Sequence, residues 1–206
     1  ERRRAAGDEA GLEGLLERLA AVVPDPSEKR DLLVERAQIL ERLDRRSDAI
    51  EVVRSVADEL APQHLPTLQL LAQLCESAED IGGLADALER QMGLLEDAGL
   101  RLPIARKLAD LYDEPLDDRS KAIDALYAWA EADGTDLEPQ KRLVDHLGAE
   151  ERYPELVAAL DAVTHLETDP ELSGEAVRRA ATISAEKLEN IDAAWNRLAP
   201  RIDSDP

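Results

Sequence analysis

Apolar residues recur along this chain at the three- and four-residue spacing of amphipathic helices, most clearly between Asp48 and Cys75. The first half of this stretch places its apolar residues on one helical face: Ile50, Val53, Val56, Ala57 and Leu60. The second half repeats the pattern after Pro62, with Leu68, Leu71, Ala72, Leu74 and Cys75. Ser47 or Asp48 is expected to cap the first helix, and Pro66 to lie in the first turn of the second.

The same pair of helices recurs along most of the chain. A large apolar residue in one helix of each pair returns every 34 to 38 residues, as Leu16, Val53, Leu88, Leu126, Leu160 and Trp195. A small or β-branched residue in the other helix returns every 35 to 37 residues, as Ala37, Ala72, Ala109, Val144 and Ala180. Paired helices at this period are typical of an α-solenoid. We therefore predict an all-α, right-handed solenoid of antiparallel helix pairs, with about 11 helices and a repeat of 34–38 residues.

The spacing inside the pairs resembles tetratricopeptide repeats in a degenerate form. That family places Leu and a small residue near the middle of the first helix, with Tyr three residues further on. Leu108, Ala109 and Tyr112 match this arrangement, and Leu71, Ala72 and Cys75 or Leu143, Val144 and Leu147 match it more loosely. In the second helix, Ala122, Leu126 and Trp129 fit the family's positions. The resemblance covers roughly residues 11 to 198.

We expect one repeat domain over residues 8–200, a disordered or cut end at 1–7, and a tail at 201–206. The last helix is expected from Asn190 to Leu198, where Pro200 stops it. Trp195 should pack inward on the preceding helix near Ile183. An apolar edge near Leu198 and Ile202 would then stay exposed, to meet further repeats or to drive weak end-to-end self-association.

Composition limits the classes of partner that the chain can bind. The chain is 44% hydrophobic but only 2% aromatic, without Phe, so its core should be aliphatic. Its 25 basic and 46 acidic residues give a net charge of −21, which repels nucleic acid and anionic membranes. The abundance of Arg and Ala is what a GC-rich bacterial genome encodes, and the acidity also suits a salty habitat. Either origin would make the charge a background property.

Neither a membrane-spanning run nor a signal-peptide pattern is visible, which favours a cytoplasmic location. The chain opens at Glu1 without Met, so we interpret it as a fragment of a longer protein or as a processed one. This interpretation weakens the argument from a missing signal peptide.

The sequence contains no catalytic, cofactor-binding or metal-binding signature. His64, His146 and His165 are not spaced to converge on a metal ion, and the single Cys75 occupies a core position. The acidic segment 113–118 lacks the ligand spacing of a calcium loop and is interpreted as a solvated turn, with Ser120 capping the next helix. We predict that the chain is not an enzyme and takes no cofactor.

In tetratricopeptide arrays the first helix of each repeat lines a concave face. Counted from the small residue of each such helix, the resemblance implies a groove formed by Gln38, Glu41, Gln73, Glu76, Arg106, Asp110, Asp113, Lys141 and Asp145. Asp110 and Asp145 stand where the family's clamp for peptide carboxylates needs Asn, so that clamp is not expected. A solvated face is the alternative, with Arg106–Asp110 and Lys141–Asp145 as local i,i+4 ion pairs.

Three functions follow from this reading. The favoured one is a scaffold that binds a protein or peptide segment on the concave face, with a basic segment preferred if the acidic strip is functional. The second is a structural solenoid that stacks on further repeats. The third is a regulatory repeat domain of a larger multidomain enzyme.

Overall fold

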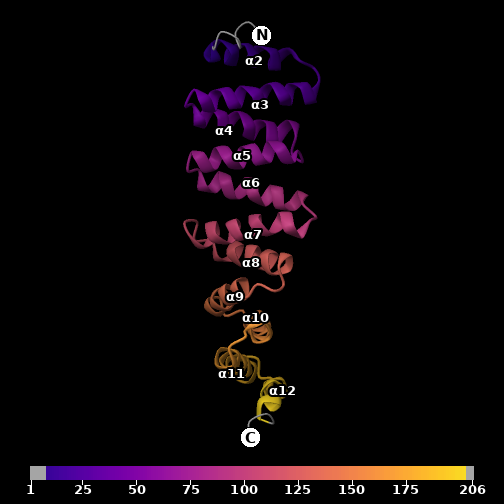
Figure 1. Ribbon diagram of the computed structural model, residues 1–206, viewed down its shortest axis with the longest axis vertical. Helices are drawn as coiled ribbons and strands as arrows, with labels where there is room; N and C mark the ends of the chain where they lie inside the picture. The colour runs from indigo at the N-terminus through magenta and orange to yellow at the C-terminus, as the bar shows by residue number, and fades with distance from the viewer. Residues whose placement is uncertain (1–7, 203–206) are drawn as a thin grey trace. The chain divides into compact units, whose positions relative to one another are not determined.

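The computed structural model describes residues 8–202, and over that range the chain folds into α-helices joined by short turns (Figure 1). The predicted end at 1–7 and residues 203–206 of the predicted tail lie outside the described residues. The helices are α2 (Glu9–Val22), α3 (Pro26–Arg42), α4 (Arg46–Ser55), α5 (Leu65–Ser77), α6 (Ile81–Leu94), α7 (Ala98–Asp113), α8 (Arg119–Ala132), α9 (Glu138–Ala149), α10 (Tyr153–Leu166), α11 (Pro170–Glu186) and α12 (Ile191–Ile202). Eleven helices within residues 8–202 confirm the predicted all-α architecture.

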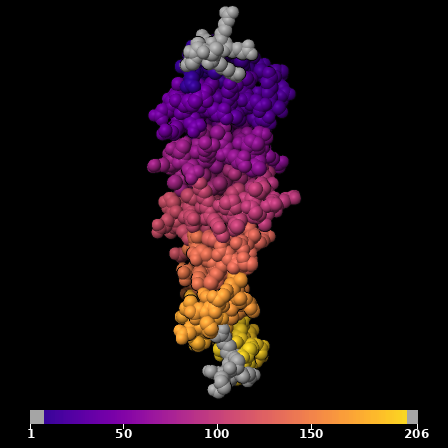
Figure 2. Space-filling model, in the orientation of Figure 1, coloured from indigo at the N-terminus to yellow at the C-terminus, as the bar shows by residue number. Residues whose placement is uncertain are grey.

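The chain forms two compact units, Glu1–Leu95 and Glu96–Pro206. The first contains α2 to α6 and the second contains α7 to α12. Within each unit, successive helices in the chain pack on one another as antiparallel neighbours. Figure 2 shows side chains closing the spaces between the ribbons of such neighbours. Each unit is therefore a run of helix pairs, and a single repeat domain over 8–200 stays a prediction.

The two sequence ladders form the core. The small ladder residues Ala37, Ala72, Ala109, Val144 and Ala180 are all buried, as are the large ones Leu16, Val53, Leu88, Leu126 and Leu160. Cys75 is fully buried, as predicted. Ala49 and Ala122, at the matched small position of the second helices, are also fully buried. The repeat period is thus confirmed as the period of core contacts.

The last ladder residue breaks the pattern. Trp195 is 60% exposed, and its neighbour Ala194 takes the buried position instead, so the predicted inward packing of Trp195 is wrong. Ladder residues such as Leu16, Leu126 and Leu160 lie in helices that pack on the helix after them, whereas within residues 8–202 no helix follows α12. The exposed apolar residues of α12 are Ile191 and Trp195, while Leu198 is half-buried. The side chain of Ile202 lies outside the described residues.

Pro200 does not end the last helix as predicted, because α12 runs through it to Ile202. A proline removes one backbone hydrogen bond from a helix, and in the final turn few later hydrogen bonds depend on that one. The rule that proline stops a helix therefore predicted an end at Leu198, whereas α12 ends at Ile202.

An acidic residue in the left-handed conformation follows the first helix of every pair. These residues are Asp44, Glu79, Asp117, Glu151 and Glu189, with φ between 49° and 60°. In three of the turns, a backbone amide reaches the carbonyl five residues earlier: Arg45 to Leu40, Asp80 to Cys75 and Arg152 to Leu147. Asp118 and Asn190 reach six residues back, to Tyr112 and Ser184. The three turns with a five-residue span are Schellman-type helix ends, where glycine is the usual left-handed residue.

The helix starts differ in part from those expected. Asp118, and not Ser120, caps α8 by accepting a hydrogen bond from the Lys121 amide at 3.1 Å. Neither Ser47 nor Asp48 caps α4, which begins one residue earlier without a side-chain cap. Pro66 does lie in the first turn of α5, as predicted.

The helix expected up to about Leu60 changes character at its end. α4 continues into a π-helical segment, η1 (Val56–Leu60), in which the Ala61 amide bonds to the Val56 carbonyl at 2.9 Å. Arg90 of α6 donates to the Ala57 carbonyl at 2.7 Å and to Asp58 at 2.8 Å. In a π-helical turn each amide bonds to the carbonyl five residues earlier, which changes the pairing of amides with carbonyls. The Ala57 carbonyl in this segment accepts its hydrogen bond from Arg90.

The left-handed turns give a first testable prediction. Left-handed backbone is strained for residues with a Cβ atom, so Asp44→Gly, Glu79→Gly and Glu151→Gly should each raise the free energy of unfolding by about 0.5–1 kcal/mol. The exposed pair between Asp44 and Arg46 loses little by comparison. Urea denaturation followed by helical circular dichroism measures the change. As a control, Glu51→Gly inside α4 should instead lower stability by about 1 kcal/mol. Stability lowered by all four substitutions would contradict the strain argument.

Candidate functional site

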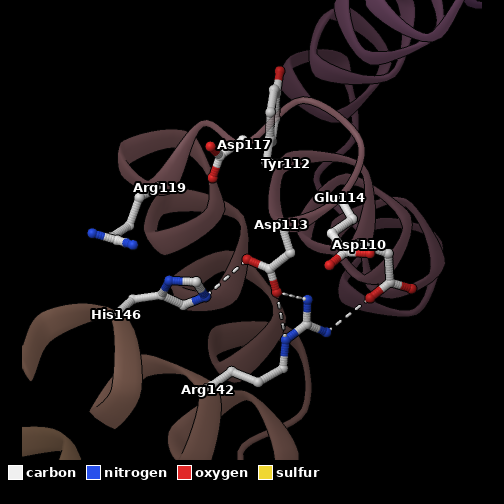
Figure 3. A pocket seen from close by; sticks show the side chains of 8 residues that line it. All are labelled: Asp110, Tyr112, Asp113, Glu114, Asp117, Arg119, Arg142 and His146. Atoms are coloured by element: carbon white, nitrogen blue, oxygen red, sulfur yellow. Dashed lines mark hydrogen bonds and ion pairs between the residues drawn. The ribbon is translucent and has the colours of Figure 1, made fainter. Parts of the chain in front are cut away.

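The first helices of the pairs in the second unit, α7, α9 and α11, carry two neighbouring depressions. One, which we name the acidic pocket, has a volume of about 510 Å³ and lies between the end of α7, the turn to α8, and α9. It is lined by Asp110, Tyr112, Asp113, Glu114, Asp117, Arg119, Arg142 and His146 (Figure 3). Four of the lining residues are carboxylates: Asp110, Asp113, Glu114 and Asp117. Arg119, Arg142 and His146 are the basic residues of the lining.

Arg142 of α9 joins that helix to α7. Its guanidinium donates to Asp110 at 2.8 Å and through two nitrogens to Asp113, at 3.2 and 2.5 Å. Burial lowers the pKa of Arg142, but the hydrogen bonds to Asp113 and Asp110 outweigh burial and leave its pKa above the ordinary value. The cation is therefore held firmly in place.

His146 completes this cluster from the next turn of α9. Its Nε2 lies 2.8 Å from Oδ1 of Asp113, and the two form an ion pair when the imidazole is protonated (Figure 3). Asp113 thus faces two basic groups, and its carboxylate is shared between them. Both basic groups of the cluster, Arg142 and His146, are therefore paired with Asp113.

Carboxylates at the mouth of the acidic pocket are less constrained. The side chain of Asp110 is 70% exposed although it bonds to Arg142, and Glu114 and Asp117 are exposed. Figure 3 shows Glu114 and Asp110 next to each other, one helical turn apart, with Arg119 on the opposite side near His146. Within residues 8–202, Glu114 and Asp117 form no ion pair. The mouth therefore presents negative charge to the solvent.

The second depression, which we name the apolar hollow, lies between α9, α10 and α11 and has a volume of about 310 Å³. Its apolar lining is Val144, Leu160, Val163, Leu172 and Ala176, and its charged rim is Lys141, Asp145, Glu167, Glu175 and Arg179. Leu172 is 49% exposed, so about half of its side chain at the edge of the hollow is open to water. The hollow combines an apolar floor with a polar rim, the ordinary composition of a binding pocket.

One rim pair fixes the edge of the apolar hollow. Lys141 Nζ lies 3.0 Å from Glu167, and this contact, with the Asp169 amide, holds the pKa of Glu167 below its usual value. Asp145, Glu175 and Arg179 form no ion pair within the described part of the chain. These three charges are available to a ligand.

The structure brings four of the predicted groove residues to these depressions. Asp110 and Asp113 line the acidic pocket, and Lys141 and Asp145 line the apolar hollow. In the first unit, Gln38 of α3 and Gln73 and Glu76 of α5 are exposed and Glu41 is half-buried. That all nine form one groove stays a prediction.

Arg106 has a structural task that the sequence did not suggest. It bonds to Asp136 at 2.6 Å, and its guanidinium lies 4.9 Å from the centre of the Trp129 ring. The Glu138 amide, Arg106 and Trp129 Nε1 together hold the pKa of Asp136 below its usual value. The expected i,i+4 pairs are wrong: Arg106 reaches Asp136 and Lys141 reaches Glu167, each in a following segment of the chain.

Sequence reasoning missed Arg142, His146, Leu172, Glu175 and Arg179. The i,i+4 spacing of Arg142 and His146 on one face of α9 was a usable signal for the first two. The rule that places groove residues one and four positions after the small ladder residue fails on α11. Counted from Ala180, it gives Ala181 and Ser184, which are buried at 3% and 1% exposure. The face of α11 that borders the hollow could not be found by that rule.

In residues 8–202, no group of three or more His, Cys, Asp or Glu residues is placed to hold a metal ion. None of the helices in that range is long and apolar enough to cross a membrane.

Comparison with known proteins gives matches among solved structures. No family model matches it, and no curated protein does. Among solved structures, a crystal structure of MamA has 15% sequence identity and a TM-score of 0.45, covering 88% of this chain and 95% of that one. YrrB, described as a TPR protein with an unusual peptide-binding site, has 20% identity and a TM-score of 0.41, covering 84% of each chain.

A third solved structure, a Podosopora anserina putative kinesin light chain with nearly identical TPR-like repeats, has 18% identity and a TM-score of 0.40. It covers 86% of this chain and 94% of that one. Two of these three structures, YrrB and the kinesin light chain, are described as containing TPR or TPR-like repeats. The arrangement of the chain in helix pairs is established by the packing of successive helices and by the buried ladder residues.

Proposed function

We propose that the second unit is a protein-interaction module that binds a protein segment across α7, α9 and α11. The observation that carries the proposal is the apolar hollow, where an exposed leucine, Leu172, stands beside an apolar floor within a charged rim. An apolar side chain of the bound segment would be removed from water in the hollow. The charged side chains of the rim would form hydrogen bonds with the backbone of that segment. No catalytic step is assigned to the chain.

The test uses displayed random peptides of about a dozen residues, selected on the full chain. Selected peptides should bind the parent chain and lose about tenfold in affinity on Leu172→Asp, the loss expected for an anchor contact. Leu100→Asp is the matched control, because Leu100 is also an exposed leucine in the first turn of its helix and lies outside both depressions. It should leave affinity unchanged.

Two results would overturn this function. Peptides that bind Leu172→Asp as well as the parent would place the site elsewhere. If no peptide is selected and sedimentation shows self-association, assembly through the exposed Ile191 and Trp195 of α12 becomes the better account. The hollow would then be an ordinary surface depression.

A further inference from the structure

We propose that the bound segment carries an apolar residue for the apolar hollow and a lysine or arginine for the acidic pocket, about three residues apart. This inference rests on the proposed function, since it names the chemistry of the partner at that same face. Its first support is charge. Asp110 and Glu114 lie one turn apart at the mouth of the acidic pocket, and Glu114 has no ion-pair partner within residues 8–202.

The end of α7 adds to the attraction for a cation. Glu114 follows the last residue of α7, so the carboxylates lie beside a helix C-terminus. The carbonyls of Asp110, Leu111 and Tyr112 already accept hydrogen bonds from later amides, so the helix end adds only the negative pole of its dipole to the charge of the carboxylates. Arg142 is paired with Asp110 and Asp113, and His146 with Asp113, so within residues 8–202 Glu114 and Asp117 carry the unpaired negative charge of the lining, with Arg119 as a cation on the opposite side.

The second support is the position of α9 between the two depressions. Arg142 and His146 of α9 line the acidic pocket, while Lys141, Val144 and Asp145 line the apolar hollow. A segment that enters both must therefore cross one helix, which is about 10 Å wide with its side chains. On this ridge Asp145 adds a further unpaired carboxylate.

The width of the ridge fixes the spacing. An extended segment of polyproline II geometry rises about 3.1 Å per residue with three residues per turn. Residues i and i+3 then point to the same side about 9 Å apart, which matches the width of α9. Contacts two or four residues apart would point to different sides. The partner is therefore expected to carry an apolar and a basic residue at i and i+3.

The experiment uses synthetic peptides with one Leu and one Arg in a neutral Gly, Ser and Pro background, at separations of one to six residues. Fluorescence polarisation on the full chain should give the tightest binding at a separation of three. Replacing Arg by the uncharged isostere citrulline should weaken binding about fivefold, and added salt should remove that difference.

Variants of the chain test the pocket directly. Asp110→Asn with Glu114→Gln should bind the arginine and citrulline peptides equally. Asp124→Asn with Asp192→Asn, a matched loss of two exposed carboxylates on α8 and α12, should keep the preference for arginine. Helical circular dichroism confirms that each double variant is folded, so a loss of preference reports the pocket.

The outcomes separate this inference from the function beneath it. Equal binding of the arginine and citrulline peptides by the parent chain, with Leu172→Asp still weakening both, overturns the basic partner and leaves the function standing. A preference for arginine that survives in the Asp110 and Glu114 variant overturns the acidic pocket as its source. Binding that is insensitive to Leu172→Asp overturns the function itself.

Discussion

Ala122→Arg should lower the free energy of unfolding by about 3–5 kcal/mol, because the substitution places a charge where two helices meet without space for it. Ala122 is fully buried, with a relative solvent accessibility of 0%. It lies in α8, which packs on α7 and α9. A guanidinium there must either lose its hydration or separate the helices. Urea denaturation followed by helical circular dichroism measures the loss.

Asp124→Arg is the control for this prediction. Asp124 lies two residues further along the same helix and is exposed, so the same side chain should change stability there by only about 0.5 kcal/mol or less. Equal stability of the Ala122 variant and the parent would mean that the repeat register described above is wrong.

A second large effect is expected at Glu13 in the first unit. Its side chain is 12% exposed and accepts a 2.7 Å hydrogen bond from Arg36, whose side chain is 17% exposed. Glu13→Gln keeps the shape but removes the charge that compensates a nearly buried guanidinium. We expect a loss of about 2 kcal/mol, below the range for fully buried pairs because some water reaches both groups.

Glu17 supplies a control that shares the same arginine. It lies 2.9 Å from another nitrogen of Arg36, but its side chain is 57% exposed. Glu17→Gln should therefore cost about 0.5 kcal/mol or less in the same urea denaturation. If the two variants lose equal stability, burial is not what makes the Glu13 contact strong.

Much of the fold could be predicted because it depends on periodic burial. Ladder residues such as Leu126 and Ala109 return once per helix pair, and each is buried where the period put it. Trp195 shows the limit of the method: periodicity identifies a position in the repeat, but burial also requires a neighbour to cover it. The sequence pattern carries no information about the presence of that neighbour.

The candidate site was less predictable because it depends on contacts between helices. Asp110 lines the acidic pocket, and its partner is Arg142 of α9 and not Arg106 one turn earlier. Local spacing suggests the nearest opposite charge, whereas side chains on adjacent helices compete for the same carboxylate. The hollow beside Leu172 depends in addition on how α11 is rotated about its axis, which the position of Ala180 alone did not determine.

The left-handed turn residues also explain how this chain can keep its architecture while diverging in sequence. Asp44, Glu79, Asp117, Glu151 and Glu189 follow one another after 35, 38, 34 and 38 residues, and the first helices of the pairs range from 12 to 17 residues, so the repeat length varies while the core contacts recur. An alignment to a repeat of constant 34-residue length would lose register at three of these four steps. Acidic residues also occupy the places where such an alignment would seek glycine. Divergence at the turns hides the periodicity from sequence comparison but leaves the core contacts intact.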